Sequence, residues 1–189
     1  AEVCVVRYEN VRVPKENLLG NVGDGILIAE TAFTATAGLV GAMAIGVARK
    51  AFSIALEFAR TETRGGSVPI IQHQNVATIL SDMKAKIEAG RYLTWKACWN
   101  FDRSMGRSQE LSLINKVFTS ELMIGVITDA MRVVGVEAYK EKTGLMELLQ
   151  DAMAYPLFDG GNVGVRRLQL QRVLAAPEYD MMAAAEGIF

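Results

Sequence analysis

The chain of 189 residues has little of the chemistry that metal sites and disulfide frameworks require. It contains two cysteines, Cys4 and Cys98, and one histidine, His73, and none of them lies in a cluster of metal-ligand spacing. These counts exclude a disulfide scaffold, a zinc site built from several imidazoles and a catalytic scheme with two histidines. We therefore expect no metal, and the cysteine usage predicts an intracellular, cytoplasmic protein.

Neither sign of charge is in surplus, since 20 Lys and Arg face 21 Asp and Glu for a net charge of −1. A basic excess of the kind that attracts polyanions is missing, so we expect neither nucleic acid nor an anionic membrane as a partner. No basic segment is followed by an apolar run of the type found in targeting peptides. The sequence starts at Ala1 in strand-like text, so we expect it to continue upstream.

Residues 31–48 contain no charged side chain, which is close to the length of a membrane span. Several threonines and glycines dilute the apolarity of this stretch, and no block of bulky aliphatic residues is present. Gly38, Ala42 and Gly46 recur every four residues and predict a face that another helix approaches closely. We expect a buried bundle helix rather than a membrane span.

Apolar periodicity and helix-boundary residues predict an all-α fold. The expected helices cover residues 26–60, 72–102, 108–134 and 162–176, with a shorter one over 144–153, and they form an up-and-down four-helix bundle. The expected apolar positions are Val76, Ile79, Leu80, Met83 and Ile87 in the second helix, and Leu113, Ile114, Val117, Phe118 and Leu122 in the third.

A short β-strand precedes the helices in this prediction. β-Branched and polar residues alternate from Val3 to Val13, and Pro14 breaks the pattern. An isolated strand is marginal in water, so its partners must come from sequence elsewhere. Asp24 is the expected N-cap of the first long helix.

Asp159 is a candidate general base, because it lies in a Gly-Gly turn at the start of a helix and follows apolar residues that would desolvate it. Arg166, seven residues later, falls roughly on the same side and could hold the carboxylate. The alternative is an acidic turn residue stabilised by the helix dipole. The neighbouring Arg167 and Arg172 weaken the case for a specific pair.

A second candidate site is the loop that starts at Arg64 and leads to His73 and Gln74. Two glycines and a serine follow Arg64, so backbone donors and a fixed cation could cradle a pyrophosphate. The loop matches neither a P-loop nor a dinucleotide fingerprint, and a plain helix connection is the alternative.

In this order, these residues resemble the C-terminal half of the acyl-CoA dehydrogenase family of flavoenzymes. Residues 11–20 resemble the end of the family's middle β-domain, and residues 64–83 its flavin-contacting loop and second bundle helix. Residues 134–139 stand where the family has a Gly-Gly-x-Gly-Tyr element. The resemblance implies that residues 1–23 end the β-domain and form a linker, and that residues 24–189 form the C-terminal helical bundle domain.

The main departure is Asp159-Gly160-Gly161, where common members carry Glu-Gly-Thr. This resembles the nitroalkane oxidase branch, in which the Asp is the base and an Arg, here Arg166, is its partner. A hydroxyl that this branch uses near the flavin falls on Thr36, where we expect Ser. The resemblance implies that Asp159 removes the α-proton of a nitroalkane, with nitrite, an aldehyde or ketone, and hydrogen peroxide as products.

The resemblance further implies FAD as cofactor, oxygen as co-substrate and a homotetramer in which subunits share each FAD site. The residues implied in FAD binding are Arg64, His73, Gln74, Arg132, Gly135, Leu157, Phe158, Gly160 and Gly161. One alternative is an acyl-CoA dehydrogenase that uses Asp159 as its base. Another is a non-catalytic helical oligomerisation domain in which Asp159 only caps a helix.

Overall fold

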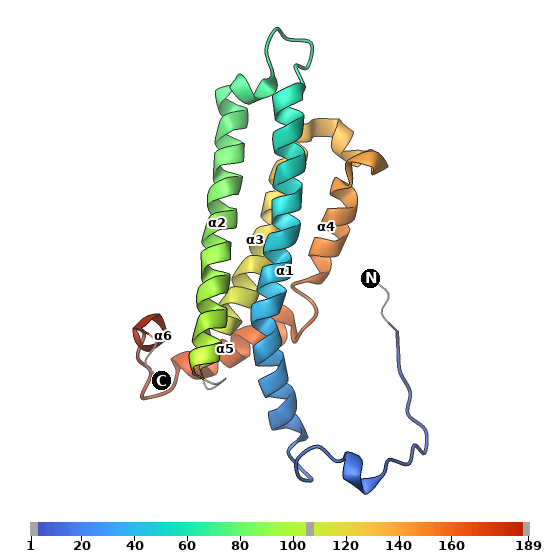
Figure 1. The fold of residues 1–189 in the computed structure, drawn as a ribbon, viewed down its shortest axis with the longest axis vertical. Coiled ribbons are helices and arrows are strands. Elements are labelled where there is room, and N and C mark those ends of the chain that lie inside the picture. Colours follow the sequence, from blue (N-terminus) through green and yellow to red (C-terminus); the bar gives the residue numbers. More distant parts are fainter. Residues whose placement is uncertain (1–3, 105–107, 187–189) are drawn as a thin grey trace.

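The computed structural model describes residues 4–104 and 108–186 (Figure 1). All regular secondary structure in these residues is helical. The three long helices lie side by side and alternate in direction, and a shorter fourth helix packs beside α3 and α1. Their bounds are Gly25–Thr61 for α1, Gln74–Arg103 for α2, Glu110–Val134 for α3 and Leu145–Ala154 for α4. The predicted all-α, up-and-down four-helix bundle is confirmed.

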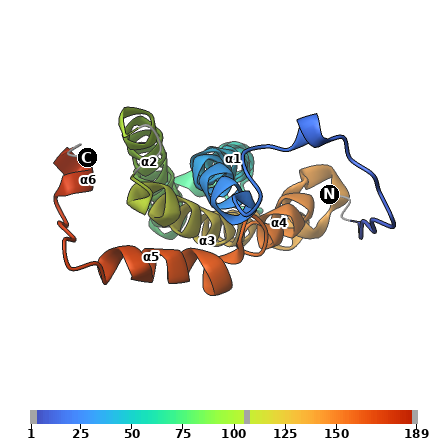
Figure 2. The same cartoon turned by 90° about the horizontal axis from the view of Figure 1, so that it is seen from below.

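Smaller elements connect and follow the bundle. Four 3₁₀ segments lie at Lys15–Asn17, Ile70–Gln72, Gly135–Tyr139 and Glu141–Thr143. The last predicted helix is instead a π-helical segment, Gly161–Arg166, followed by α5, Arg167–Leu174, and α6 covers Ala183–Glu186. Figure 2 shows α5 lying across the end of the bundle rather than along it.

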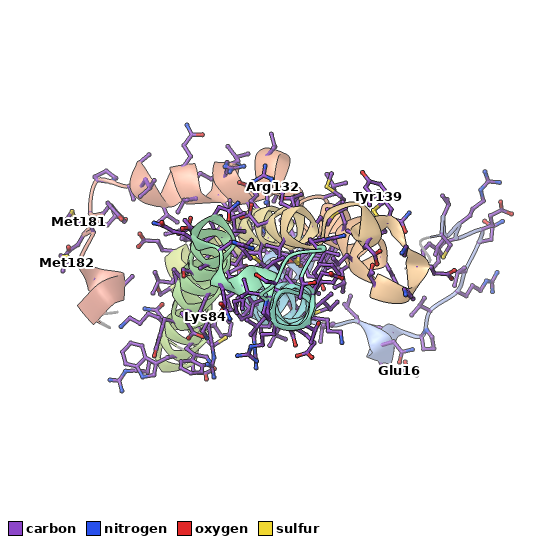
Figure 3. The ribbon with its side chains drawn as sticks, turned by 90° about the horizontal axis from the view of Figure 1, so that it is seen from above. Glu16, Lys84, Arg132, Tyr139, Met181 and Met182 are labelled. Carbon is purple, nitrogen blue, oxygen red and sulfur yellow. The ribbon has the colours of Figure 1, made fainter. Side chains whose placement is uncertain are left out.

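Small side chains line the buried face of α1. Ala44, Ala48, Ala51, Ala55 and Ala59 recur every three or four residues and are fully buried. Alone among the described helices, α1 has the length and apolarity of a membrane span, and 44% of its most apolar window is buried. Seen along the bundle in Figure 3, the neighbouring helices lie on one side of α1. Packing within the bundle therefore explains the buried alanine face of α1, whereas its large apolar side chains Phe33, Leu39 and Met43 are exposed.

Two glycines of α1 let neighbouring helices approach, though not the set that the spacing predicts. A Cβ at Gly38 would lie 3.1 Å from Cys98 Sγ on α2, and one at Gly41 would lie 2.0 Å from Asn115 Nδ2 on α3. Gly46 is exposed and has no atom within 4 Å of its Cβ position, so no described helix of the same chain approaches the predicted face there.

Two local predictions before α1 were also wrong. Residues 4–13, the described part of the predicted strand, are exposed and form no strand, because no sheet edge is present to accept their hydrogen bonds. Asp24 does not cap α1 through its side chain. Its carboxylate instead accepts hydrogen bonds from the backbone and side chain of Asn21 at 2.8 and 3.1 Å.

The buried face of α3 is rotated from the predicted one and is polar in its N-terminal half. Phe118, which was predicted to face inward, is 44% exposed. Asn115, Lys116, Thr119 and Ser120 are buried in its place. Every buried side-chain N or O atom among the described residues has a hydrogen-bond partner, which is what makes this polar face tolerable.

We expect Gly41→Ala to lower the free energy of unfolding by about 1–3 kcal/mol, because the new methyl group must displace the buried Asn115 amide. That amide accepts a hydrogen bond from Thr94 Oγ1 at 2.8 Å, which the displacement would break. Gly46→Ala, on the same helix, is the matched control and should raise stability by up to about 1 kcal/mol through helix propensity. Urea unfolding of both variants checks this, and equal effects would contradict it.

Candidate active site

Asp159 stands on a short left-handed turn between α4 and the π-helical segment. The φ angles of Asp159, Gly160 and Gly161 are 52°, 88° and 62°, so three successive residues adopt a conformation that favours glycine. Asp tolerates this region better than most residues, but a non-glycine there is strained and persists only where its surroundings hold it. The turn therefore needs contacts that fix it.

The Asp159 carboxylate binds one partner on each oxygen. Arg166 Nη2 donates to Oδ2 at 2.9 Å, and Thr36 Oγ1 lies 3.0 Å from Oδ1. The side chain is 8% exposed, and the helix that follows receives no side-chain cap. The predicted Asp159–Arg166 pair and the Thr36 hydroxyl are thus brought together, and the capping alternative finds no support in this geometry.

Arg166 is fully buried and ties the turn to α1. Its Nε donates to the Asp159 carbonyl at 2.7 Å, and its Nη2 also donates to the Phe33 carbonyl at 3.0 Å. A Cβ at Gly160 would lie 3.1 Å from Arg166 Nε, so a glycine leaves room for the guanidinium. Arg166 therefore fixes both the backbone and the carboxylate of Asp159.

Lys116, which the sequence analysis did not identify, holds the same turn from the side of α3. Its ammonium is fully buried and donates to the Phe158 carbonyl at 2.9 Å and to Asn162 Oδ1 at 2.7 Å. Burial and, to a smaller extent, the charge of Arg166 lower the pKa of Lys116 to about 8, whereas Asp159 and Glu121 oppose the shift.

Asn162 extends this polar network along α3. Its Nδ2 donates to Ser120 Oγ at 3.0 Å and to Glu121 Oε1 at 3.2 Å. Glu121 also accepts hydrogen bonds from Arg167 at 3.0 and 3.1 Å near the surface. The turn is thus connected to buried α3 side chains on one face and to α1 on the other.

Apolar side chains lie around the carboxylate. Leu157 is 78% exposed, and Phe158 and Phe33 are also exposed. The Phe158 ring packs edge-to-face on Tyr155 with ring centroids 5.0 Å apart. The predicted residues Leu157, Phe158, Gly160 and Gly161 therefore share the Asp159 turn, which can present an apolar surface beside a base.

The remaining predicted residues lie at the opposite end of the bundle. Arg64 and His73–Gln74 lie between the end of α1 and the start of α2, while Arg132 and Gly135 lie at the end of α3 (Figure 1). Arg132 binds Asp129 at 2.8 Å. Thr36 and Thr61 are 25 residues apart on α1, so about 37 Å separates the two ends at 1.5 Å per residue.

At the other end of the bundle, Arg64 packs against the end of α3 and the Phe58 ring. Arg64 Nη2 donates to the Val134 carbonyl, and the guanidinium lies 4.9 Å from the centroid of the Phe58 ring. Gly135 has φ 70° and ψ −150°, a region open essentially to glycine alone, and a Cβ there would lie 3.2 Å from Arg64 Nη2.

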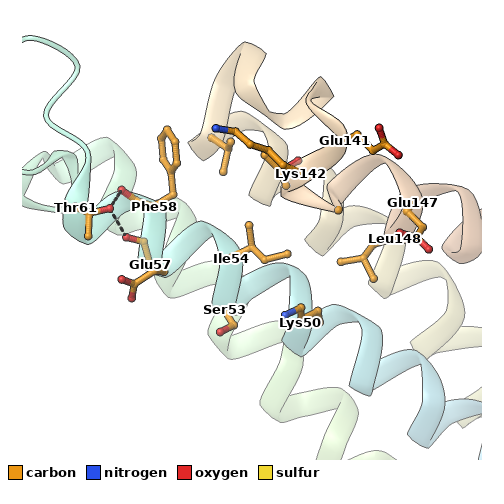
Figure 4. Close-up of a pocket in the computed structure, with 13 residues that line it drawn as sticks. Lys50, Ser53, Ile54, Glu57, Phe58, Thr61, Glu141, Lys142, Glu147 and Leu148 are labelled. Carbon is orange, nitrogen blue, oxygen red and sulfur yellow. Dashed lines mark hydrogen bonds between the residues drawn. The ribbon is translucent and has the colours of Figure 1, made fainter.

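A groove of about 740 Å³ opens between α1 and the segment that leads into α4 (Figure 4). It is lined by Lys50, Glu57, Lys142, Glu147 and apolar residues such as Leu148, and no predicted catalytic residue reaches it. Three glutamates, including Glu141, and two lysines line it, so no basic surplus marks it as an anion site. In the described ranges, no three His, Cys, Asp or Glu side chains gather as metal ligands would.

Known proteins that resemble this chain in sequence and those that resemble it in structure include the same enzymes. The family model for the acyl-CoA dehydrogenase C-terminal domain matches residues 23–175. The chain is 44% identical to the nitroalkane oxidase of Podospora anserina over 97% of its own length and 44% of the relative's. It is 33% identical to the cyclohexane-1-carbonyl-CoA dehydrogenase of Geobacter metallireducens, over 93% of this chain and 44% of that one.

Solved structures include a nitroalkane oxidase studied for the roles of one arginine and one aspartate in the reaction of that flavoprotein. It matches with a TM-score of 0.84 and 43% identity, over 93% of this chain and 42% of that one. The present chain therefore spans less than half the length of the relatives it matches.

We expect Arg166→Leu to lower the free energy of unfolding by about 3–5 kcal/mol, because it leaves the Asp159 carboxylate buried without its counter-charge. Arg167→Leu, at the next position, is the control. The Arg167–Glu121 pair is 48% and 47% exposed, so its loss should cost at most about 1 kcal/mol. Denaturant unfolding measures both values, and similar losses would contradict the assigned burial.

Proposed function

Because the chain belongs to the acyl-CoA dehydrogenase family, whose C-terminal domain it matches over residues 23–175, we propose that it is the C-terminal part of an FAD-dependent nitroalkane oxidase. Residues 24–189 are the helical domain in this proposal, and residues 1–23 are the end of a β-domain and a linker. The sequence identity of 44% to a nitroalkane oxidase, against 33% to an acyl-CoA dehydrogenase, favours the first activity.

The observation that carries the proposal is the buried Asp159–Arg166 pair. The two residues are seven apart in this chain, and so are the aspartate and the arginine whose roles in the reaction were studied in the related flavoprotein. A base in that reaction must be a carboxylate held in one orientation with a free lone pair. Asp159 meets this requirement, since each of its oxygens has one protein partner and can accept more.

In the proposed reaction, Asp159 accepts the proton from the carbon that bears the nitro group. Arg166 holds the carboxylate through Oδ2, and Thr36 orients Oδ1. The exposed side chains of Leu157 and Phe158 offer apolar surface to the alkyl part of the substrate. Thr36 supplies the hydroxyl that the resemblance led us to expect from a serine.

FAD, when bound, accepts the electrons of the substrate and passes them to oxygen. Overall, one nitroalkane, one oxygen and one water give an aldehyde or ketone, nitrous acid and hydrogen peroxide, so that all atoms balance. The residues proposed to hold the diphosphate of FAD are Arg64, His73, Gln74, Arg132 and the Gly135 backbone. Cationic and N–H donors dominate this set, which fits an anionic diphosphate.

We propose further that each FAD site is shared between subunits of a homotetramer. About 37 Å of helix separates Thr36 from the end of α1 near Arg64, so the two groups of residues in one chain lie too far apart to meet at one reacting centre. A second copy that supplies its Arg64 end to the Asp159 end of the first removes this difficulty. The intracellular location stays a prediction.

Asp159→Asn in the full-length protein should lower turnover of neutral nitroethane by at least about a hundredfold, because an amide cannot accept the substrate proton. FAD should remain bound, since the amide keeps the shape of the carboxylate. Oxygen uptake and the visible absorption spectrum measure the two effects. Asp151→Asn, on the exposed face of α4, is the control and should leave turnover unchanged.

Three results would overturn this proposal in different ways. Undiminished turnover in Asp159→Asn would exclude Asp159 as the base. Anaerobic bleaching of the flavin by an acyl-CoA and not by nitroethane would instead assign an acyl-CoA dehydrogenase. A purified full-length protein without flavin absorbance would favour the non-catalytic helical domain.

The shared site predicts complementation between two inactive variants. Subunits with Asp159→Asn lack the base, and subunits with Arg64→Ala lack the cation of the FAD site. A mixed pair contains one site in which both residues are intact, so random mixing of equal amounts should restore about a quarter of wild-type activity. Co-expression of the two variants with separate purification tags, followed by an oxygen-uptake assay, measures this.

Unmixed variants provide the control and should stay inactive after the same treatment. Restoration of no activity in hybrids that contain FAD would contradict the shared site. A monomeric protein with full FAD occupancy would contradict it as well.

A further inference from the structure

Lys116 forms hydrogen bonds that the proposed reaction does not account for. Its side chain is fully buried, and its two acceptors are neutral oxygens, the Phe158 carbonyl and Asn162 Oδ1. A buried ammonium costs free energy unless hydrogen bonds and nearby charges compensate it. The charged groups that act on it are Arg166, Asp159 and Glu121, and Arg166 repels it. An apolar side chain at this position would avoid that cost.

The two acceptors of Lys116 lie on either side of the strained turn. Phe158 immediately precedes the three left-handed residues 159–161, and Asn162 immediately follows them. Arg166 Nε holds the next carbonyl, that of Asp159, at 2.7 Å. Two successive carbonyls are therefore bound by two buried cations, one from α3 and one from the π-helical segment.

Asn162 holds the end of the turn in place through further hydrogen bonds. Its backbone N–H donates to the Pro156 carbonyl at 2.8 Å, and its Nδ2 donates to Ser120, one helical turn beyond Lys116 on α3. Ser120 Oγ in turn donates to the Lys116 carbonyl at 2.7 Å. The turn is thus hydrogen-bonded to α3 at two positions, Lys116 and Ser120. These two contacts fix the distance and the orientation of the turn relative to α3.

We propose that Lys116 is a positioning residue that fixes the left-handed turn carrying Asp159, and thereby aims the carboxylate at the substrate proton. The part of this proposal that concerns the reaction rests on the proposed function. Arg166 binds the carboxylate directly, whereas Lys116 acts only through the backbone before Asp159 and the side chain after it. Proton abstraction depends on such placement, and a misplacement of about 1 Å can lower a rate about a hundredfold.

The test uses the FAD-loaded full-length protein with Lys116→Met, which keeps the length and removes the donor. Lys84→Met, at a lysine on the surface of α2 that pairs with Glu88, is the control. Hydrogen–deuterium exchange should become faster in residues 155–162 of Lys116→Met and stay unchanged elsewhere in the bundle. The Lys84→Met protein should exchange like wild type in that segment.

The kinetic test separates positioning from general damage. With neutral nitroethane, kcat/KM of Lys116→Met should fall about ten- to a hundredfold. With the nitroethane anion, which has already lost its proton, kcat/KM should stay within about twofold of wild type, because that substrate does not need the base. If Lys116→Met does not fold, Lys116→Gln, which keeps a donor group, replaces it. Its kcat/KM should also fall with neutral nitroethane and not with the anion, but by a smaller factor.

Wild-type exchange in residues 155–162 together with wild-type turnover of neutral nitroethane would overturn the proposal. An equal loss with both substrates, accompanied by loss of FAD, would also overturn it and leave Lys116 a merely structural residue. If wild-type protein does not oxidise nitroethane but residues 155–162 exchange faster in Lys116→Met, the proposed function fails and the fixing of the turn by Lys116 stands.

Discussion

The ion pair between Asp159 and Arg166 is the constraint on which the geometry of this end of the molecule depends. Arg166 has no exposed surface, so every donor it carries must find an acceptor inside the protein. It finds the carboxylate and carbonyl of Asp159, the carbonyl of Phe33 and the side chain of Gln169. These acceptors lie in α1, in the turn and in α5, so satisfying one buried cation of the π-helical segment sets the positions of these three elements together.

The π-helical segment is a consequence of this arrangement. An ordinary α-helix that began directly after the turn would present its side chains at intervals of three and four residues. The wider π-turn lets Asn162 face α3 and Arg166 face Asp159 from the same short stretch. π-Turns of this kind often occur where function demands an irregular placement of side chains.

The sequence predicted the helices well because their signals are local. The apolar face of α2 follows from periodicity, and the bundle follows from successive helices joined by short connections. Asp159 and Arg166 were found because they are close in sequence. Thr36 came only from the family resemblance, since its contact with Asp159 joins residues 123 apart.

Lys116 and the polar face of α3 escaped prediction for a related reason. Lys116 lies three residues after Leu113 and four before Ser120, on the buried face of α3. Its helical spacing from Leu113 was the one sequence signal that pointed to its burial. We chose the apolar residues Ile114, Val117 and Phe118 as the inner face, because hydrophobicity usually identifies the core. The hydrogen-bond acceptors of the Lys116 ammonium lie more than 40 residues away in the sequence.

The same geometry explains why the carboxylate belongs to an aspartate. Arg166 binds the carbonyl of residue 159 through Nε and the carboxylate of the same residue through Nη2, at 2.7 and 2.9 Å. Neighbouring donors of one planar guanidinium can reach both groups only if the carboxylate stays near its own backbone. A glutamate would carry its carboxylate one methylene further out, and the guanidinium would then have to release one of the two. The buried arginine therefore favours an aspartate at position 159.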